Sequence, residues 1–593
     1  MCGIVGAVGC RQLRSYLIDG LKTLEYRGYD SSGLAFSHEE APLIYRIPGR
    51  VHLLEEMVPL SLEAGIGIGH TRWATHGAPT ETNAHPHISH SGLFTLVHNG
   101  VIDNYRALHQ MLSDLGYQFN TETDTEVIAN LIEHNYKQMG DVLKALRQSM
   151  KMLEGSYALV IIHQGDDERL FFAKNHSPLL IGHGPDANFL ASDYLPMLKH
   201  VKDFYALTDH QFGYISKDEV AVFDLPGNSK AKISYHQTDL TSEDINLEGY
   251  PHYMLKEIEE ADNVIRHLID NYHDGRNYLF NPKLLDTITA SDQLIFLACG
   301  TSYHACLIGK RYLEALGKRV DVYIASEWAY YPVITGKNPL FIIVSQSGET
   351  ADLIHCVKNI KQYKFPLLTI TNTKGSTLDR EANFTLLLFA GIEIAVASTK
   401  AYVAQVTLLA LLAAALKGDS QLIPDLYHVI EALKKVIDMK SKFEKIADFL
   451  ATKENAFYLG RGFDYDVSLE ASLKLKEITY IHSEGLPGGE LKHGPIALID
   501  KDTPVIIFVS DSLTALPIRS NLQEVLARGA HVIVISSQSL AKGKDAIVVP
   551  DVPVHLSVLP KVMVAQYLAY YTALKRGANI DKPRNLAKSV TVE

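Results

Sequence analysis

The second residue of the chain is a cysteine, Cys2, and the apolar run that follows it predicts a β-strand over residues 4–8. Aminopeptidases remove Met1 when the next residue is small, and Cys2 would then carry a free α-amino group beside its own thiol. An α-amine titrates near ~8 and a thiol near ~8.5, so one residue would hold a base and a nucleophile. The simpler alternative is a small buried cysteine at the start of a strand.

Three polar clusters at predicted strand ends could complete an amide-cleaving site around Cys2, namely residues 69–77, 98–100 and 122–124. Asn99 and Gly100 can offer a side-chain amide and a backbone N–H to an oxyanion. An α-amino-acid substrate needs a cation for its carboxylate and an anion for its ammonium, and Arg72 and Asp124 suit these tasks. Taken singly, Asn99-Gly100 fits a hairpin turn and Asp124 a first-turn helix charge. Together with Cys2 they specify a glutamine site.

Two serine-rich turns in the second half of the chain could bind a phosphate. Residues 345–350 (SQSGET) follow an apolar strand and open a predicted helix, and residues 299–302 (CGTS) make the equivalent turn after the preceding strand. Hydroxyls and backbone N–H groups at a helix N-terminus hold phosphate, and the helix dipole reinforces them. A single turn of this kind also fits a plain helix cap. Two turns, together with residues 396–400 (VASTK), favour an anion site, and the lack of a Walker lysine or GxGxxG disfavours nucleotides.

Three further features could supply acid, base or amine groups. Lys474 and Glu477 share one face of a predicted helix at i, i+3, although such a pair is usually a solvated salt bridge. His493 lies in a glycine-bounded loop, as acid/base histidines often do. The tail of residues 583–593 is apolar enough to dock, and an ordinary solvated terminus is the alternative.

The segment that contains the predicted glutamine site, from residue 1 to about 240, has the pattern of a β-rich domain. Alternating apolar runs predict strands at residues 66–69, 93–97, 156–162 and 170–173. One helix is predicted at about residues 13–24. A second helix begins at Thr123, where Thr-x-x-Glu predicts a capping box with Glu126. Helices packed on stacked sheets give a layered α+β domain.

The second half has a different pattern. A polar linker at residues 241–250 precedes helical periodicity at 253–268, and solid apolar runs at 294–297, 341–344 and 367–370 then predict buried parallel strands. Related segments recur at an offset of roughly 160 residues, which is the size of a domain. The sequence therefore predicts two doubly wound α/β domains.

Composition narrows the function classes. The chain has 593 residues, enough for several cores, and a net charge of -12 that disfavours nucleic acid or an anionic membrane as partner. The longest apolar stretch, residues 406–416, is too short to span a bilayer and reads as a buried helix. Five cysteines without CxxC spacing or disulfide density favour a reduced, cytoplasmic protein.

Several motifs carry a resemblance to known families. The first half resembles the N-terminal-nucleophile glutamine amidotransferases in residues 2–6 (CGIVG), 26–31 (YRGYDS), 70–77 (HTRWATHG) and 98–100 (HNG). The phosphoribosyltransferase or ATP-pyrophosphatase signatures that mark two relatives within this group do not occur. The serine-rich turns resemble the sugar isomerase (SIS) domain in its tandem form. The whole chain resembles the glutamine–fructose-6-phosphate aminotransferases (isomerizing), and without the long insertion of the animal enzymes it looks like the bacterial form.

This resemblance implies a fold and a domain order. The fold class is an α+β N-terminal-nucleophile (αββα) glutaminase domain followed by two doubly wound α/β SIS domains. The expected segments are a glutamine amidotransferase domain at 1–240, a linker at 241–250, a first SIS domain with leading helices at 251–430, a second at 455–580, and a tail at 581–593 that closes the sugar site.

The resemblance also implies residue roles and partners. In the glutamine site the expected residues are Cys2 as nucleophile, Asn99 and Gly100 as oxyanion donors, Arg72, Thr75, His76 and Asp124 around glutamine, and Trp73 as the gate of an internal ammonia channel. The sugar-phosphate residues are Thr301, Ser302, Ser345, Gln346, Ser347, Thr350, Val396 and Ala587. In the chemistry on the sugar, His493 of a neighbouring subunit opens the ring, Lys588 forms a Schiff base, and Glu477 moves a proton with Lys474 close by. We expect L-glutamine and D-fructose 6-phosphate as substrates, D-glucosamine 6-phosphate for hexosamine synthesis as product, a homodimer, and no metal or other cofactor.

Two other readings compete. A SIS-type deaminase or deglycase would release ammonia from an amino sugar, and it would leave the N-terminal domain without a purpose. A sugar-phosphate-sensing regulator would need a helix-turn-helix and a basic face, and the acidic first half with Cys2 supplies neither.

Overall fold

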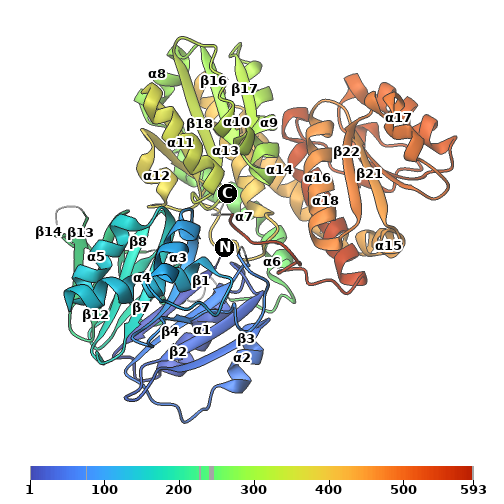
Figure 1. Ribbon diagram of the computed structural model, residues 1–593. Coiled ribbons are helices and arrows are strands. Elements are labelled where there is room, and N and C mark those ends of the chain that lie inside the picture. The colour runs from blue at the N-terminus through green and yellow to red at the C-terminus, as the bar shows by residue number, and fades with distance from the viewer. Residues whose placement is uncertain (1, 75, 226–228, 239–245, 591–593) are drawn as a thin grey trace. The chain divides into compact units, whose positions relative to one another are not determined.

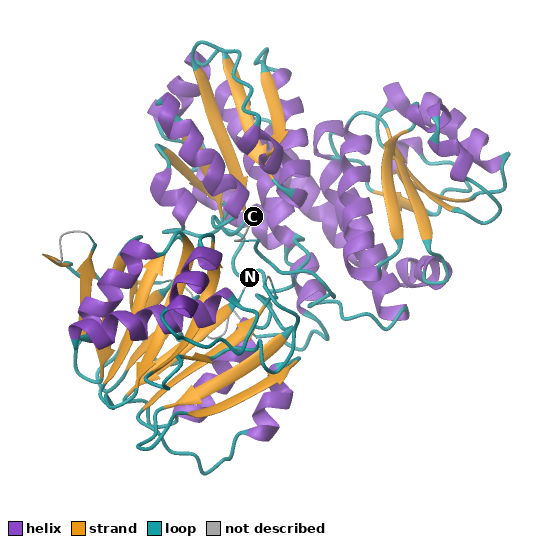
Figure 2. Cartoon of the chain, in the orientation of Figure 1, coloured by secondary structure: helices purple, strands orange, loops and turns teal. Residues whose placement is uncertain are grey.

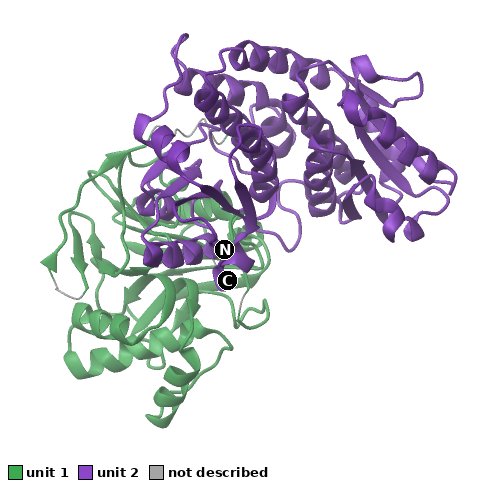
Figure 3. Cartoon of the chain, turned by 90° about the horizontal axis from the view of Figure 1, so that it is seen from above, with its two compact units in different colours: residues 1–246, 589–593 green, residues 247–588 purple. Residues whose placement is uncertain are grey.

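The structure is a computed structural model that describes residues 2–74, 76–225, 229–238 and 246–590. The chain divides into two compact units (Figure 3), which are Met1–Asn246 with Ser589–Glu593, and Leu247–Lys588. Each unit is described by itself below. The predicted bounds of the amidotransferase domain, the linker, the SIS domains and the tail remain predictions.

The first unit consists of two stacked antiparallel sheets between two helical layers (Figures 1 and 2). One sheet has the strand order β15-β11-β9-β10-β1-β4-β2-β3, and the other β14-β13-β12-β8-β7-β6-β5. The strands are β1 (Gly3–Val8), β2 (Ser31–Phe36), β3 (Leu43–Pro48), β4 (Ile66–Arg72), β5 (His87–Ile88), β6 (Phe94–Ile102), β7 (Gly155–His163), β8 (Arg169–Asn175), β9 (Leu180–His183), β10 (Asn188–Ala191), β11 (Asp203–Ala206), β12 (Gln211–Ser216), β13 (Val220–Asp224), β14 (Ser229–Lys230) and β15 (His236–Gln237).

Alternation along the strands builds the core between these sheets. Ile4 of β1 and Ile68 of β4 face Val97 of β6 and Val160 of β7, and all four side chains are fully buried. The helices cover the outer faces: α1 (Leu13–Leu24) and α2 (Val51–Met57) on the first sheet, and α3 (Tyr105–Asp114), α4 (Asp124–Met139) and α5 (Val142–Met152) on the second side. The predicted αββα arrangement is confirmed.

The predicted capping box at the start of α4 is wrong. Thr123 is the N-cap residue, but its side chain makes no capping bond. The Glu126 carboxylate instead accepts the N–H groups of Asn120 (2.9 Å) and Thr121 (2.7 Å). The loop before the helix therefore folds back far enough to take the carboxylate that a capping box would use. The Thr123 hydroxyl bonds Nε2 of His87 at 3.2 Å.

The second unit contains two parallel five-stranded sheets with the same topology, as the internal repeat predicted. Their strand orders are β17-β16-β18-β19-β20 and β22-β21-β23-β24-β25, so that in each sheet the first strand in sequence lies second in space. The strands are β16 (Gln293–Ala298), β17 (Val320–Ile324), β18 (Pro339–Ser345), β19 (Leu367–Thr371), β20 (Phe384–Leu387), β21 (Asn455–Gly460), β22 (His482–Pro487), β23 (Pro504–Val509), β24 (His531–Ser537) and β25 (Ile547–Val549).

One core joins the two sheets of this unit. Phe296 of β16 and Tyr458 of β21 belong to the same buried cluster, together with Leu409 and Tyr567 of the helices that pack between the sheets. The helices are α6 (Tyr253–Glu259), α7 (Ala261–Tyr272), α8 (Pro282–Ala290), α9 (Gly300–Glu314), α10 (Ala325–Tyr330), α11 (Ala351–Tyr363), α12 (Thr377–Glu381), α13 (Lys400–Lys417), α14 (Leu422–Ile437), α15 (Lys440–Leu450), α16 (Phe463–Thr479), α17 (Ser512–Leu526) and α18 (Val558–Lys575), with 3₁₀ turns at Glu490–His493, Pro495–Leu498, Gln538–Leu540 and Val554–Leu556. The predicted helical stretch at 253–268 is broken between α6 and α7.

Helix α13 is the one described helix that is long and apolar enough to cross a membrane by length and composition. In the structure, 83% of its apolar window is buried inside the protein. Val406, Leu409 and Leu412 pack into the core that the two sheets share. The helix is therefore a core helix of this unit.

Candidate active sites

Cys2 lies at the edge of the first unit's core, where β1 pairs with β4. Its Sγ accepts the backbone N–H of Trp73 at 3.2 Å and lies 3.6 Å from the Trp73 carbonyl oxygen. Burial raises the pKa of the Cys2 thiol, and the Trp73 N–H offsets part of this rise. The thiol is therefore protonated at neutral pH and needs a base close by to become a nucleophile.

Asn99 and Gly100 do not form a hairpin turn, because both lie inside β6. The Asn99 Nδ2 donates to the carbonyl oxygen of Cys2 at 3.0 Å, so one N–H of this amide is used and the other remains for a substrate. Gly100 has φ +140°, and a Cβ there would lie 2.0 Å from the Ser156 carbonyl oxygen. Only glycine fits this position. The structure thus brings Asn99 and Cys2 together, as the sequence predicted.

The residues expected around the amino-acid end of glutamine come from two segments. The Arg72 guanidinium, at the end of β4, donates to the carbonyl oxygens of His76, Gly77 (3.1 Å) and Ala78 (3.3 Å) and so shapes the loop that follows. Asp124, at the start of α4, is buried and accepts the N–H of Ile102 at 2.9 Å, three residues beyond Asn99. Thr75 lies outside the described residues.

The two serine-rich turns meet in the second unit. Strands β16 and β18 are parallel neighbours, so the turns at their carboxyl ends adjoin. After β18, the Ser345 hydroxyl accepts the N–H of Gly348 (3.1 Å) and bonds the Thr350 hydroxyl (2.9 Å), while the Ser347 hydroxyl accepts the N–H of Glu349 (3.2 Å). Gly348 has φ +66°, and a Cβ there would lie 2.0 Å from Oγ of Ser376. The turn is therefore a tight loop of hydroxyl and N–H groups at the start of α11.

The turn after β16 places its two hydroxyl groups in different surroundings. Ser302 accepts from Nε2 of Gln405 at 2.9 Å, while Thr301 donates to Glu470 at 3.1 Å and accepts from Nζ of Lys474 at 3.0 Å. The Thr301 hydroxyl thus bonds two side chains of helix α16, which packs on the sheet that contains β21. The predicted phosphate residue Gln346 takes part through its backbone carbonyl, which accepts the N–H of Asn372 at 3.1 Å.

Helix α16 carries three charged side chains on one face. Lys474 is fully buried and bonds Glu477 at 2.7 Å, with Glu470 3.4 Å away. Burial acts to lower the pKa of Lys474, but the carboxylates of Glu477 and Glu470 outweigh it and raise the pKa above its ordinary value. Glu470 also pairs with His304 of α9 at 2.7 Å. The Lys474–Glu477 pair is therefore buried, and not the solvated salt bridge that its i, i+3 spacing alone would favour.

Lys588, near the end of the chain, reaches the loop between β20 and α13. Its Nζ bonds the carboxylate of Glu393 and lies 3.3 Å from Oγ of Ser398. The Lys588 side chain is 3% exposed and that of Glu393 is fully buried. Burial opposes the charge of Glu393, but Lys588 and the N–H groups of Thr399 and Ala401 hold its pKa below the ordinary range. Ala587 directly precedes Lys588.

Val396 lies in the same loop as Glu393, whereas His493 does not contact the predicted sugar site of its own chain. The N–H of Val396 donates to the carbonyl oxygen of Asp581 at 2.9 Å, which joins the same loop to the start of the tail. His493 lies at the exposed end of a 3₁₀ turn, and among the described residues it has no hydrogen-bond partner. The structure therefore does not bring His493 to the other sugar-site residues of its own chain.

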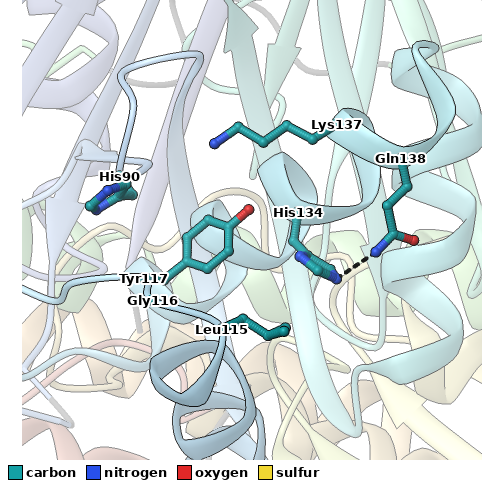
Figure 4. Close-up of a pocket in the computed structure, with 7 residues that line it drawn as sticks. All are labelled: His90, Leu115, Gly116, Tyr117, His134, Lys137 and Gln138. Atoms are coloured by element: carbon teal, nitrogen blue, oxygen red, sulfur yellow. Dashed lines mark hydrogen bonds between the residues drawn. The ribbon is translucent and has the colours of Figure 1, made fainter.

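Sequence reasoning missed Glu470 and Glu393. Glu470 lies four residues before Lys474 and seven before Glu477, so a helical wheel of α16 would have placed all three on one face. Glu393 has no such signal, because its partner Lys588 is far away in the sequence. A surface pocket of the first unit, lined by His90, Leu115, Gly116, Tyr117, His134, Lys137 and Gln138, was also not predicted (Figure 4). Several of its side chains come from the end of α4 opposite Asp124, so it is separate from the Cys2 site.

Comparison with known proteins gives matches along the whole chain. The SIS domain family matches residues 287–415 and 449–576, and the glutamine amidotransferase domain family matches residues 70–199. The glutamine–fructose-6-phosphate aminotransferase [isomerizing] of Listeria monocytogenes is 46% identical over 604 residues, with all of both chains covered. That of Geobacillus kaustophilus is 46% identical over 603 residues, again with all of both chains covered.

A solved structure supports the second unit. The C-terminal domain of glucosamine-fructose-6-phosphate aminotransferase from Francisella tularensis has 32% sequence identity and a TM-score of 0.53, and the match covers 57% of this chain and 99% of that one. Two domain families in the expected order, and full-length relatives of this identity, leave one assignment. The chain belongs to the family of glutamine–fructose-6-phosphate aminotransferases (isomerizing).

Proposed function

We propose that this chain transfers the amide nitrogen of L-glutamine to D-fructose 6-phosphate and isomerises the product to D-glucosamine 6-phosphate, with release of L-glutamate. The observation that carries the proposal is the presence of two separate groups of reactive side chains in one chain. Cys2 and Asn99 are in contact in the first unit, and Lys474, Glu477 and Lys588 stand beside hydroxyl-rich turns in the second. The names of the full-length relatives support the same reaction.

In the glutaminase half, the Cys2 sulfur attacks the side-chain amide carbon of glutamine. Because burial keeps the thiol protonated, the α-amino group of Cys2, freed by loss of Met1, takes the thiol proton and passes it to the departing nitrogen. The free N–H of the Asn99 amide and the N–H of Gly100 stabilise the oxyanion. Ammonia leaves, and water then cleaves the thioester to release glutamate.

Arg72 and Asp124 hold the two charged groups at the other end of glutamine. The guanidinium faces the substrate carboxylate, and the carboxylate of Asp124 faces its ammonium. His76 and Thr75 complete this end of the site. Ammonia must reach the sugar without meeting bulk water, where it would be protonated, and we assign Trp73 as the gate of the path.

In the sugar half, Ser302, Ser345, Gln346, Ser347 and Thr350 hold the phosphate, with Thr301, Val396 and Ala587 along the sugar. The ε-amine of Lys588 attacks the C2 carbonyl of the open-chain sugar, and water leaves as an imine forms. Ammonia displaces the lysine from this imine. Glu477 then moves a proton from C1 to C2, which gives the aldose without any electron transfer.

Two features of the proposal concern the whole enzyme. His493 is exposed in the single chain, so we propose that it opens the sugar ring of a neighbouring subunit in a homodimer. We also propose that the enzyme works in the cytoplasm, where cysteines stay reduced.

The direct test is formation of D-glucosamine 6-phosphate from glutamine and fructose 6-phosphate. A parallel sample is first treated with a glutamine-like chloroketone that alkylates Cys2. Product that forms in the first sample and disappears in the second supports the proposal. Glutamine hydrolysis without amino-sugar in either sample would contradict the assigned acceptor, and indifference to the chloroketone would favour a deaminase.

A further inference from the structure

A buried chain of histidines connects the oxyanion donor Asn99 to the first turn of helix α4. His70 lies on β4, His98 on β6 and His85 in the loop before β5, and their side chains are 0%, 2% and 5% exposed. Thr125 of α4 is 1% exposed and joins His85 to His98. None of these four residues has a part in the reaction proposed above.

The contacts of Asn99 determine how its amide is oriented. The carbonyl oxygen of Cys2 is only an acceptor, so the group of Asn99 that faces it at 3.0 Å must be the NH₂ group. The amide oxygen of Asn99 then faces Nε2 of His70 at 3.1 Å. The same Nε2 lies 2.9 Å from the carbonyl oxygen of His98. Because both neighbours are acceptors, Nε2 of His70 must carry a hydrogen.

The other ring nitrogen of His70 must therefore be an acceptor. Nδ1 of His85 lies 3.1 Å from it and 3.0 Å from Nε2 of the same ring, and since Nε2 carries a hydrogen and cannot accept, Nδ1 of His70 is the acceptor. Nε2 of His85 is then an acceptor for the Thr125 hydroxyl at 3.0 Å, and the Thr125 oxygen accepts from Nδ1 of His98 at 3.0 Å.

Reversing the direction of donation along these hydrogen bonds leaves one contact unsatisfied. If Nε2 of His98 donated to Ser156, Thr125 would donate to His98 and Nε2 of His85 would donate to Thr125. Nδ1 of His70 would then have no donor, and Nδ1 of His85 could accept only from the Nε2–H of His70, which already faces the Asn99 amide oxygen and the His98 carbonyl oxygen. In the direction described first, Nε2 of His98 carries no hydrogen and cannot donate to the Ser156 carbonyl oxygen. This lost contact is the longest of the network, at 3.4 Å.

All three rings are neutral at physiological pH. Burial lowers the pKa of His70 to about 3 and also lowers the pKa values of His85 and His98. A neutral imidazole donates from one nitrogen and accepts at the other, so each ring has a single tautomer that fits the chain. Among the described residues, no group of three or more His, Cys, Asp or Glu side chains is placed to hold a metal ion.

We infer that Thr125 and His85 are positioning residues of the glutaminase reaction: they hold His70 in the Nε2–H tautomer, and His70 in turn keeps the NH₂ group of Asn99 directed at Cys2. This inference rests on the proposed role of Cys2 and Asn99. Loss of the chain would let the Asn99 amide turn its oxygen towards the developing oxyanion, which repels it. The effect falls on the transition state and leaves bound glutamine in place.

The test compares Thr125→Val, Thr125→Ser and the wild-type enzyme for glutamate release from glutamine. We expect Thr125→Val to lower kcat by roughly tenfold or more, short of the 10²–10³-fold cost of removing an oxyanion donor altogether. KM for glutamine should stay within about twofold. Thr125→Ser keeps the hydroxyl and should recover most of kcat. Thr95→Val is the matched control, because Thr95 is equally buried on the strand of Asn99 and its hydroxyl has no partner among the described residues.

Two ligands separate positioning from a damaged pocket. The aldehyde analogue of glutamine forms a tetrahedral adduct with Cys2 and needs the oxyanion donors, whereas glutamate does not. We expect Thr125→Val to weaken the aldehyde by the same factor as kcat and to leave glutamate affinity unchanged. Alkylation of Cys2 by iodoacetamide, a direct displacement without an oxyanion, should keep its wild-type rate.

Equal weakening of aldehyde and glutamate, or an unchanged kcat in Thr125→Val, would overturn the inference. His85→Gln changes another residue of the hydrogen-bonded network. It should likewise lower kcat and weaken the aldehyde without changing glutamate affinity, and a wild-type kcat would count against the proposal. The wild-type enzyme tests the proposed function separately, because it must release glutamate whatever the variants do.

Discussion

The two SIS domains share one strand order, but their anion sites differ. In the first, the N-cap residue of α11 is Thr350, whose side chain makes no capping bond to the first turn of the helix. In the second, the carboxylate of Asp511 caps α17 by accepting the N–H of Leu513 at 2.9 Å. The helix that could bind an anion is thus already capped by the chain's own carboxylate.

A second carboxylate, that of Asp464, occupies the donor groups beside the turn after β23 in the second domain. Asp464, in the first turn of α16, accepts the N–H of Ser510 (2.9 Å), the Ser510 hydroxyl (2.6 Å) and Nζ of Lys561 (2.9 Å). Asp464 is 1% exposed and Lys561 is fully buried. Serine hydroxyls, N–H groups and a cation are the donors that would hold a phosphate. Here a fixed side chain takes all of them.

The second domain contributes to the first domain's site instead. Its helix α16 packs against α9 and supplies Lys474, which bonds Thr301, and Glu477 beside it. The two domains share a fold but differ in the side chains at these turns, and on this difference we base the proposal that only the first domain's turns bind the sugar phosphate. We therefore expect one sugar-phosphate site in each chain, built with groups from both domains.

The largest effect is expected from Lys588→Ala. Loss of the covalent amine should lower amino-sugar formation by at least roughly 10³-fold, the scale on which enzymes suffer when a nucleophile is removed. Basal glutamine hydrolysis should be largely kept, because Cys2 is untouched. Both rates can be measured on one preparation, with Lys582→Ala in the same tail as control. Substantial synthesis by Lys588→Ala would mean that another lysine, such as one in the second domain, carries the reaction.

Breaking the filled site of the second domain should cost stability more than activity. Asp464→Asn leaves the buried Lys561 cation without its partner, which costs about 3–5 kcal/mol in comparable pairs. We expect a large drop in the thermal midpoint, part of which the double variant Asp464→Asn/Lys561→Met should recover. The exposed Asp551→Asn is the control. A second equivalent of fructose 6-phosphate bound to any of these variants would show that the carboxylate had only masked a working site.

A matched pair of serines tests the two turns directly. Ser347→Ala removes a hydroxyl from the first domain's turn and should raise KM for fructose 6-phosphate by roughly 10–100-fold, since a hydrogen bond to a charged group is worth about 1.5–3 kcal/mol. The segment 343–347 (IVSQS) recurs in the second domain as 508–512 (FVSDS), so Ser512 corresponds to Ser347. Ser512 should tolerate alanine with KM within about twofold. Steady-state kinetics on both variants decide the point. Similar losses at the two serines would contradict the difference between the turns.

The last prediction concerns pH and the buried carboxyl of Glu257 on α6, whose Oε2 has no hydrogen-bond partner among the described residues. Burial, together with the nearby Glu393, raises the pKa of Glu257 to about 8. Between its ordinary value and this one, the folded protein binds a proton that the unfolded chain releases, so stability falls as pH rises from about 5 to 8. Glu257→Gln should flatten this slope. Thermal midpoints at several pH values, with the exposed Glu248→Gln as control, measure it, and identical slopes for Glu257→Gln and wild type would refute the assignment.

Local patterns were enough to predict much of the fold. Helix α1 has the predicted bounds of residues 13–24, and the apolar runs at 294–297 and 341–344 became the parallel strands β16 and β18. These features depend on periodicity and buried runs within one segment. The repeat at roughly 160 residues likewise predicted two sheets of one topology.

Features that depend on distant partners were missed. Glu126 does not cap α4, because the loop before the helix takes its carboxylate. Asn99 and Gly100 lie within a strand because β7 pairs with them, with Ala158 opposite Asn99 and Tyr157 opposite Gly100. Glu393 pairs with Lys588, which is far away in the sequence. The filled site of the second domain depends on Asp464, Ser510 and Lys561, which no short motif brings together. Tertiary contacts decided each of these outcomes.

The central claim is that the two sites of this chain carry out one reaction. We would supply glutamine labelled with nitrogen-15 in its amide, together with fructose 6-phosphate and an excess of unlabelled ammonium, and measure the label in the glucosamine 6-phosphate by mass spectrometry. We predict that nearly all of the product carries nitrogen-15, as the proposed transfer of ammonia from glutamine to the sugar without release to bulk water requires. Product labelled only in the proportion of the bulk ammonium pool would contradict this claim.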